Sequence, residues 1–163
     1  MKKLITGLAV LVLVFVMGGL VLGANTAQQT VTYEVTAINE VSVSGDPGNL
    51  VVNTATAGSQ PTADTDATTT WAITTNESTK KMTGSINTAM PANTTLEVNL
   101  TAPTGGTSQG DVTLSTTAAD LVTGISTVAE SGLTITYTLS ATISAGVVAQ
   151  AQKTVTLTLT DGA

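Results

Sequence analysis

The sequence predicts an all-β protein: an antiparallel, immunoglobulin-like β-sandwich of about eight or nine strands in residues 25–163, preceded by an N-terminal signal helix in residues 1–24. Two observations predict the sandwich. Threonine supplies 35 of the 163 residues, and branching at its Cβ, as in valine and isoleucine, favours extended backbone. Short alternating apolar segments also recur at roughly ten-residue spacing with turn residues between them, which is typical of strands that bury one face.

Residues 1–24 have the pattern of an export signal. Lys2 and Lys3 give a basic start, and an apolar run from Leu4 to Ala24 follows. Because the run approaches the roughly 20 apolar residues that span a bilayer, two alternatives stay open: a cleaved signal peptide, or an uncleaved signal anchor. We therefore expect a secreted or cell-surface protein that meets a membrane only through this segment.

Composition argues against several classes of function. Without residues 1–24 the chain keeps three lysines against eleven carboxylates, a net charge of −8, and it contains no arginine. Such a surface repels phosphate backbones, so nucleic acid and anionic lipid are not expected partners. The absence of histidine and cysteine removes the common nucleophilic triads and nitrogen or sulfur metal sites. We expect no enzymatic activity, and calcium is the one candidate cofactor.

The first half of the domain is predicted to hold strands separated by breaker-rich turns. Alternation places these strands at residues 31–43 with a phase slip at Ile38, at 50–52, at 71–75 and at 82–86. The phase slip predicts a bulge in the first strand. Residues 57–70, rich in small polar residues and breakers, predict a loop.

The second half predicts longer strands. Alternation places them at residues 96–100, 112–114, 133–143 and 147–159. Between them, Thr117 as a cap and Gly124 as a terminator predict one or two turns of helix. The last two strands exceed the usual five to six residues, so we expect a bend, a bulge or a protruding tip there. Lys153 interrupts the final apolar series, either as an edge-blunting lysine or as a partner in a lysine isopeptide bond.

Three aromatic residues remain after the leader, and all lie at apolar phases of predicted strands. Trp71 is expected to fill the core, because a single tryptophan in a sandwich is more often buried than a ligand platform. The rings of Tyr33 and Tyr137 are expected to be buried too, with their hydroxyls at the rim.

Two breaker-rich segments carry the only candidate metal ligands. Asp64 and Asp66 lie in the predicted loop 57–70, and Asp46 lies in the turn 45–48. Calcium takes several oxygen ligands from such loops, so these three carboxylates are the candidate site. The alternative is that they are turn aspartates, chosen for hydrogen bonds to nearby backbone.

One stretch carries a family resemblance. Residues 31–35 (VTYEV) together with residues 37–45 (AINEVSVSG) resemble the opening of exported bacterial proteins that carry one threonine-rich β-sandwich. The architecture is similar to fimbrial and biofilm-fibre subunits, in which an N-terminal strand completes the sheet of a neighbour. The chain lacks the Phe-Ser-Asp segment that follows the signal in the fibre family of TasA and camelysin type. The resemblance implies a β-sandwich fold and an extracellular address.

Two hypotheses of function follow. In the first, the chain is a non-catalytic structural or cell-surface protein, a subunit of an extracellular filament or coat whose partner is itself or another surface protein. Strand addition would then use an assembly strand with alternating apolar side chains, namely Val31, Tyr33, Val35 and Ala37. In the second, it is a binding or adhesion module that recognises glycan, or uses calcium, through loops 55–70 and 102–110 at one end of the sandwich.

Overall fold

The computed structural model describes residues 25–162, and its contacts divide the chain into a unit of residues 1–34 and a unit of residues 35–163. The predicted signal segment, residues 1–24, lies outside the described residues. Residues 25–34 form neither helix nor strand, and their side chains are exposed. All the elements described below belong to the second unit.

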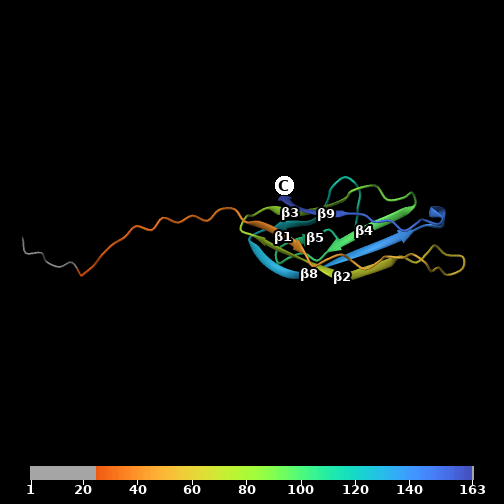
Figure 1. The fold of residues 1–163 in the computed structure, drawn as a ribbon, viewed down its shortest axis with the longest axis horizontal. Helices are drawn as coiled ribbons and strands as arrows, with labels where there is room; N and C mark the ends of the chain where they lie inside the picture. The colour runs from red at the N-terminus through yellow and green to blue at the C-terminus, as the bar shows by residue number, and fades with distance from the viewer. Residues whose placement is uncertain (1–24, 163) are drawn as a thin grey trace, which may run out of the picture. The chain divides into compact units, whose positions relative to one another are not determined.

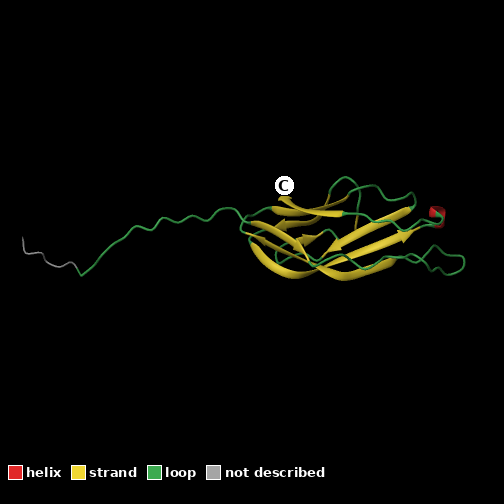
Figure 2. Cartoon of the chain, viewed as in Figure 1, coloured by secondary structure: helices red, strands yellow, loops and turns green. Residues whose placement is uncertain are grey.

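The second unit is an all-β domain (Figures 1 and 2). Its described elements, in chain order, are β1 (Asn39–Val43), β2 (Asp64–Thr75), β3 (Lys80–Ile86), β4 (Thr94–Leu100), β5 (Thr107–Ser108), β6 (Val112–Thr113), β7 (Ala119–Ile125), β8 (Val128–Ala141), the 3-10 helix η1 (Ile143–Ala145) and β9 (Val155–Asp161). No helix in the described part of the chain has the length and apolar character needed to cross a membrane.

The strands form two antiparallel sheets. One has the order β1-β2-β8-β4-β6, and the other has the order β5-β7-β3-β9. Alternate side chains on β3 and β4 are buried, as the two-residue period of their sequences predicts. Because one cluster of buried side chains draws on both sheets, the sheets pack as two layers around a shared core. The predicted all-β, sandwich-like fold is confirmed.

The core is aliphatic apart from two aromatic rings. Its buried apolar members are Trp71, Ile73, Met82, Ile86, Leu96, Val98, Leu100, Leu114, Leu121, Val122, Ile125, Leu133, Ile135 and Tyr137. The side chain of Trp71 is only 1% exposed, and its indole N–H donates to the carbonyl of Thr101 at 3.1 Å. Both predictions of a buried ring, for Trp71 and for Tyr137, are confirmed.

The predicted strand over residues 31–43 is wrong in its first part. Residues 31–38 lie outside every described strand, and β1 starts at Asn39. The prediction that Tyr33 buries its ring is also wrong, because its side chain is exposed. The reason is the partner strand: β2 ends at Thr75, opposite Asn39, and only Asn76 continues the pairing by donating its N–H to the carbonyl of Ile38.

The predicted loop over residues 57–70 is wrong beyond residue 63, and the predicted strand at residues 50–52 is absent from the described structure. β2 begins at Asp64 and pairs with β8 through a register shift between Asp66 and Thr69. Here the β-branched run Thr68–Thr70, which favours extended backbone, outweighs the polar, loop-like composition of the segment. The extra residue of this shift lies on β2, between Asp66 and Thr69.

The predicted helix at Thr117–Gly124 is wrong, because residues Ala119–Ile125 form β7. β7 pairs with β3 on one side and β5 on the other, and it buries Leu121 and Val122. A helix of two turns fixes many dihedral angles for few hydrogen bonds, so tertiary pairing of this short segment dominates over its helix-like capping residues.

The last two predicted strands do not pair with each other. β8 lies between β2 and β4 in the first sheet, whereas β9 is an edge strand of the second. The chain crosses between the sheets through residues 142–154, so the predicted strand at 147–159 begins only at Val155. Alternation alone could not show that these two segments belong to different layers.

Candidate functional site

The four residues of the predicted assembly strand present their side chains to solvent. Val31, Tyr33 and Val35 are 69%, 89% and 79% exposed, and Ala37 is exposed as well. A monomeric protein rarely displays several large apolar side chains in a regular row unless the row is used for an interaction. Whether these residues act as an assembly strand stays a prediction, and their exposure is the observation on which it rests.

The segment enters β1 at a defined point. The side chain of Asn76 donates to the carbonyl of Thr36 at 2.8 Å and accepts the backbone N–H of Ile38 at 2.8 Å. Asn76 therefore satisfies backbone groups just before the strand, as a side-chain cap does in a turn. The chain is thus fixed from Thr36 onward.

The start of β1 and the end of β9 lie at the same end of the sandwich, which we call the base. Asn39, the first residue of β1, donates its side-chain N–H to Glu77, and Glu77 forms a 2.8 Å ion pair with Lys80. Lys80 also pairs with Asp161, the last residue of β9. We call the opposite end the tip, where β8 ends at Ala141 and η1 follows (Figure 2).

This network shifts two pKa values. The hydrogen bond from Asn39, followed by the one from Lys80, lowers the pKa of Glu77. The hydrogen bonds to Asp161 and then to Glu77 raise the pKa of Lys80. Both groups are therefore charged over the whole neutral range, and they act as a structural clamp at the base rather than as an acid and a base.

The carboxylates of Asp64 and Asp66, two of the candidate calcium ligands, accept hydrogen bonds from backbone N–H groups instead of forming a cluster. Asp64 accepts the N–H of Val51 at 2.7 Å and that of Thr65 at 3.0 Å. Asp66 accepts the N–H of Thr68 at 3.1 Å and its hydroxyl at 2.8 Å. Within residues 25–162, no group of three or more acidic side chains is placed to hold a metal ion. The calcium site stays a prediction, and the geometry favours the alternative of hydrogen-bonding aspartates.

Asp66 also contacts the segment before β2. The N–H of Thr68, then its hydroxyl, and finally the N–H of Gly48 lower the pKa of Asp66. A Cβ added to Gly48 would lie 2.7 Å from a carboxylate oxygen of Asp66, so the carboxylate would have to shift to make room for it. Burial is the main cause that raises the pKa of Tyr137, and the charge of Asp46 raises it further.

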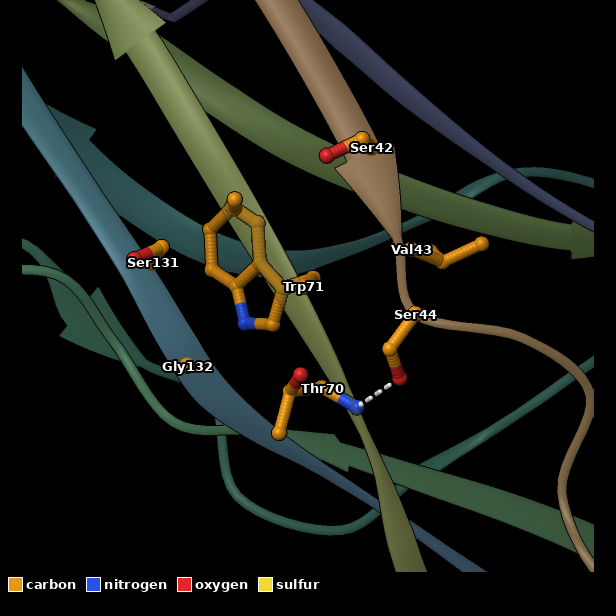
Figure 3. A pocket seen from close by; sticks show the side chains of 8 residues that line it. Ser42, Val43, Ser44, Thr70, Trp71, Ser131 and Gly132 are labelled. Atoms are coloured by element: carbon orange, nitrogen blue, oxygen red, sulfur yellow. Dashed lines mark hydrogen bonds between the residues drawn. The ribbon is translucent and has the colours of Figure 1, made fainter.

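A shallow hollow of about 130 Å³ lies beside Trp71, between the end of β1 and β8 (Figure 3). Its lining combines the hydroxyls of Ser42, Ser44 and Ser131 with apolar side chains. The hydroxyl of Ser44 accepts the N–H of Thr70 at 2.9 Å, which fixes β1 against β2. The lining contains no carboxylate, amine or aromatic face open to a ligand, so it offers little chemistry beyond hydrogen bonding.

A second hollow of about 210 Å³ contains Lys80 and Lys81. Their ammonium groups already pair with acidic side chains, Lys81 with Asp120 at 2.9 Å. Lys153, the candidate for an isopeptide bond, donates to the hydroxyl of Thr88 and to the carbonyl of Ala89, each at 2.8 Å. These contacts favour a structural role for the three lysines of the domain.

The two loops proposed to bind a ligand together lie at opposite ends. Gln60 accepts the N–H of Ile143 at 3.0 Å, which places its loop at the tip. Thr104 donates its N–H to both carboxylate oxygens of Glu130, at 3.0 and 3.1 Å, near the start of β8 at the base. The prediction that loops 55–70 and 102–110 share one end of the sandwich is wrong.

Comparison of the sequence with protein-family models and with curated proteins gives no match. The geometry of the described residues is therefore the basis for inferring function. Its most unusual feature is the alternating row of exposed apolar side chains that precedes β1. The sequence predicts this row but does not show that β1 and β9 are edge strands, because alternation does not reveal which strands lie at an edge.

Proposed function

We propose that this chain is an exported, non-catalytic structural protein, a subunit of an extracellular filament or coat that assembles by strand addition. One observation carries the proposal: Val31, Tyr33, Val35 and Ala37 are exposed at every second position of a segment that belongs to no described strand. A segment with this pattern has the features of a β-strand, yet it pairs with no described sheet of its own chain. Its natural partner is a second copy of the chain or another surface protein.

Strand addition would stabilise the segment in two ways. Backbone N–H and C=O groups would pair with an exposed sheet edge, and alternate side chains would pack on an apolar surface and set the register. Full burial of a valine side chain contributes about 1.5–3 kcal/mol, so a few such residues can offset the cost of ordering the segment.

The remaining assignments extend the proposal. The basic start and apolar run of residues 1–24 support export, with the mature domain outside the cell. A sheet of five strands facing a sheet of four supports an immunoglobulin-like arrangement. The absence of histidine and cysteine from the sequence supports a non-catalytic function.

A matched pair of variants tests the proposal. In the first variant, Val31, Tyr33 and Val35 become serine; in the control, the intervening Thr32, Glu34 and Thr36 become serine. Full-length protein is recovered from the cells that export it, and its assembly is followed by electron microscopy and sedimentation. We expect the first variant to stay monomeric and the control to assemble like the parent chain. Equal assembly by both variants, or a strictly monomeric parent, would show the proposal to be wrong.

A further inference from the structure

The longest edge available for an added strand is β9, an edge strand with seven residues. It pairs with β3 on one side, and no described strand pairs with its other side. The remaining edges are shorter: five residues in β1 and two each in β5 and β6. Since an unpaired edge presents a row of N–H and C=O groups, the longest edge offers the most hydrogen bonds to an incoming strand.

The register of β9 shows which residues present these groups. Asn87 donates its N–H to the carbonyl of Thr154 at 3.0 Å, and Gly162 donates to the carbonyl of Thr79 at 2.6 Å. In an antiparallel ladder, residues two apart direct their backbone groups to the same side. Even-numbered residues of β9 therefore pair with β3, and the backbone groups of Val155, Leu157, Leu159 and Asp161 point to the open edge.

The side chains at the open edge are apolar and incompletely covered. Val155, Leu157 and Leu159 are partly buried and pack against the core of the sandwich. In β1, by contrast, only Val41 packs on that core, and Val43 is more than half exposed. A strand added to β9 would thus extend the apolar layer, whereas one added to β1 would find little apolar surface.

We propose that residues 30–37 of one copy add, antiparallel, to the open edge of β9 in a second copy. This inference rests on the proposed function and identifies the acceptor. Directly opposite residues share a face of the sheet, so the odd-numbered apolar residues of the segment face the odd-numbered apolar residues of β9. With Val35 opposite Leu157, Tyr33 lies opposite Leu159, and the single charge of the segment, Glu34, lies opposite the neutral Thr158.

The direction of β9 determines how copies stack. β9 runs toward the base, where Asp161 is joined through Lys80 and Glu77 to Asn39, the start of β1. An antiparallel donor runs from the base of the acceptor toward its tip and leaves β9 beside Val155, so the donor's own sandwich lies on the tip side of that residue. Eight extended residues span about 26 Å, enough to follow the whole of β9. Copies then stack head to tail, a non-closing contact that generates a filament.

The tip carries apolar side chains suited to this stacking. Ile143 and Val147 are strongly exposed, and Val148 is 44% exposed. The donor's sandwich extends toward this end of the acceptor, so these side chains are available for an apolar contact with it in addition to the added strand. The tip is thus a second, independent feature of the structure that favours a partner at this end of the molecule.

Disulfide trapping tests the assignment, because the sequence contains no cysteine. Glu34→Cys is combined in one full-length chain with Thr158→Cys on β9, or with Ser42→Cys on β1 as the rival edge. All three side chains are exposed, and opposed residues of an antiparallel pair lie close enough for a disulfide. Thr156→Cys and Thr160→Cys, each combined with Glu34→Cys in place of Thr158→Cys, test pairing registers shifted by two residues in either direction.

We expect mild oxidation to give a ladder of covalent oligomers with one of the β9 positions, and at most dimers with each single-cysteine control. A ladder from the pair Glu34→Cys and Ser42→Cys but from none of the β9 pairs would overturn the β9 assignment. Filaments that give no ladder with any β9 pair would overturn it too. Both results would still agree with self-assembly. Monomers without any ladder would overturn both the assignment and the proposed function. Mixing Glu34→Cys full-length chain with a Thr158→Cys chain that lacks residues 25–35 is expected to yield a one-to-one covalent dimer, since the shortened chain can accept but cannot donate.

Discussion

Asn76 and Ile38 are joined by two hydrogen bonds. The backbone N–H of Ile38 donates to the side-chain oxygen of Asn76 at 2.8 Å, and the backbone N–H of Asn76 donates to the carbonyl of Ile38 at 3.3 Å. This pair marks the point at which the exposed N-terminal segment becomes part of the sandwich. It separates a region stabilised by its own domain from one that, in our proposal, is stabilised by a neighbour.

Replacing Asn76 with alanine tests this junction. Asn76→Ala removes the side-chain contacts to Ile38 and Thr36, and each such hydrogen bond contributes about 0.5–1.5 kcal/mol. We expect a melting temperature several degrees lower, measured by circular dichroism on the full-length chain. Asn53→Ala, at an exposed loop position, is the control and should leave the melting temperature unchanged. Equal melting of the two variants would contradict a clamping role for Asn76.

Trp71 provides a direct probe of the core. It is the single tryptophan of the chain and is almost wholly buried, so its fluorescence should be blue-shifted in the folded protein and move to the red on unfolding. Trp71→Ala should cost about 3–5 kcal/mol, since it removes a large buried ring and leaves a cavity. Denaturant titration followed by circular dichroism measures this loss. A solvent-exposed emission spectrum in the native protein would contradict the described packing.

The contact between Gly48 and Asp66 predicts a non-additive pair of substitutions. A Cβ on residue 48 would lie 2.7 Å from the Asp66 carboxylate, so Gly48→Ala should lower the melting temperature. In an Asp66→Ala background the same change should have little effect, because the obstructing carboxylate is gone. Thermal melts of the four proteins in this double-mutant cycle measure the coupling. Additive effects would show that the two residues do not interact.

Asp66 should also contribute to acid sensitivity. Its folded-state pKa is lowered from 3.8, so its contribution to stability is complete above the pKa of the unfolded chain and is lost as the pH falls below about 4. Asp66→Asn should therefore lower the melting temperature at pH 7 and flatten its decline between pH 5 and pH 3. Melting curves of both proteins across this range provide the test. Parallel declines would indicate that other carboxylates determine the acid response.

Ionic strength should control assembly. Residues 25–163 carry a net charge of −8, and repulsion between copies is screened as the Debye length falls from about 30 Å at 0.01 M salt to about 8 Å at 0.15 M. We expect faster growth of light scattering at the higher salt concentration, with the odd-position serine variant as a control that does not respond. Slower assembly with added salt would indicate that charge attraction drives the contact.

Much of the fold could be predicted because burial of one face leaves a two-residue period in the sequence. Met82, Val98 and Ile135 were all found in this way, and each is buried. The partner of each strand could not be predicted, since β8 and β9 have the same alternation yet lie in different sheets. Thr117 and Gly124 led to a wrong helix prediction, because local capping signals carry no information about a neighbouring strand.

The candidate site was predicted less completely, again for a physical reason. Alternation at Val31, Tyr33 and Val35 shows that a segment can pair and pack, but not whether its sheet belongs to the same chain. Asp64 and Asp66 are likewise ambiguous by sequence, because an aspartate in a polar segment can bind calcium or accept backbone N–H groups. The structure adds what the sequence could not show, namely that Val51 and Thr68 donate their backbone N–H groups to these carboxylates.

The central claim is that residues 30–37 become a strand only when a neighbour provides the sheet. Amide hydrogen exchange of these residues, compared between assembled material from the cell surface and the dissociated monomer, tests it most directly. We expect strong protection of residues 30–37 in the assembly and rapid exchange in the monomer. Rapid exchange of this segment in both states, with the sandwich protected throughout, would contradict it.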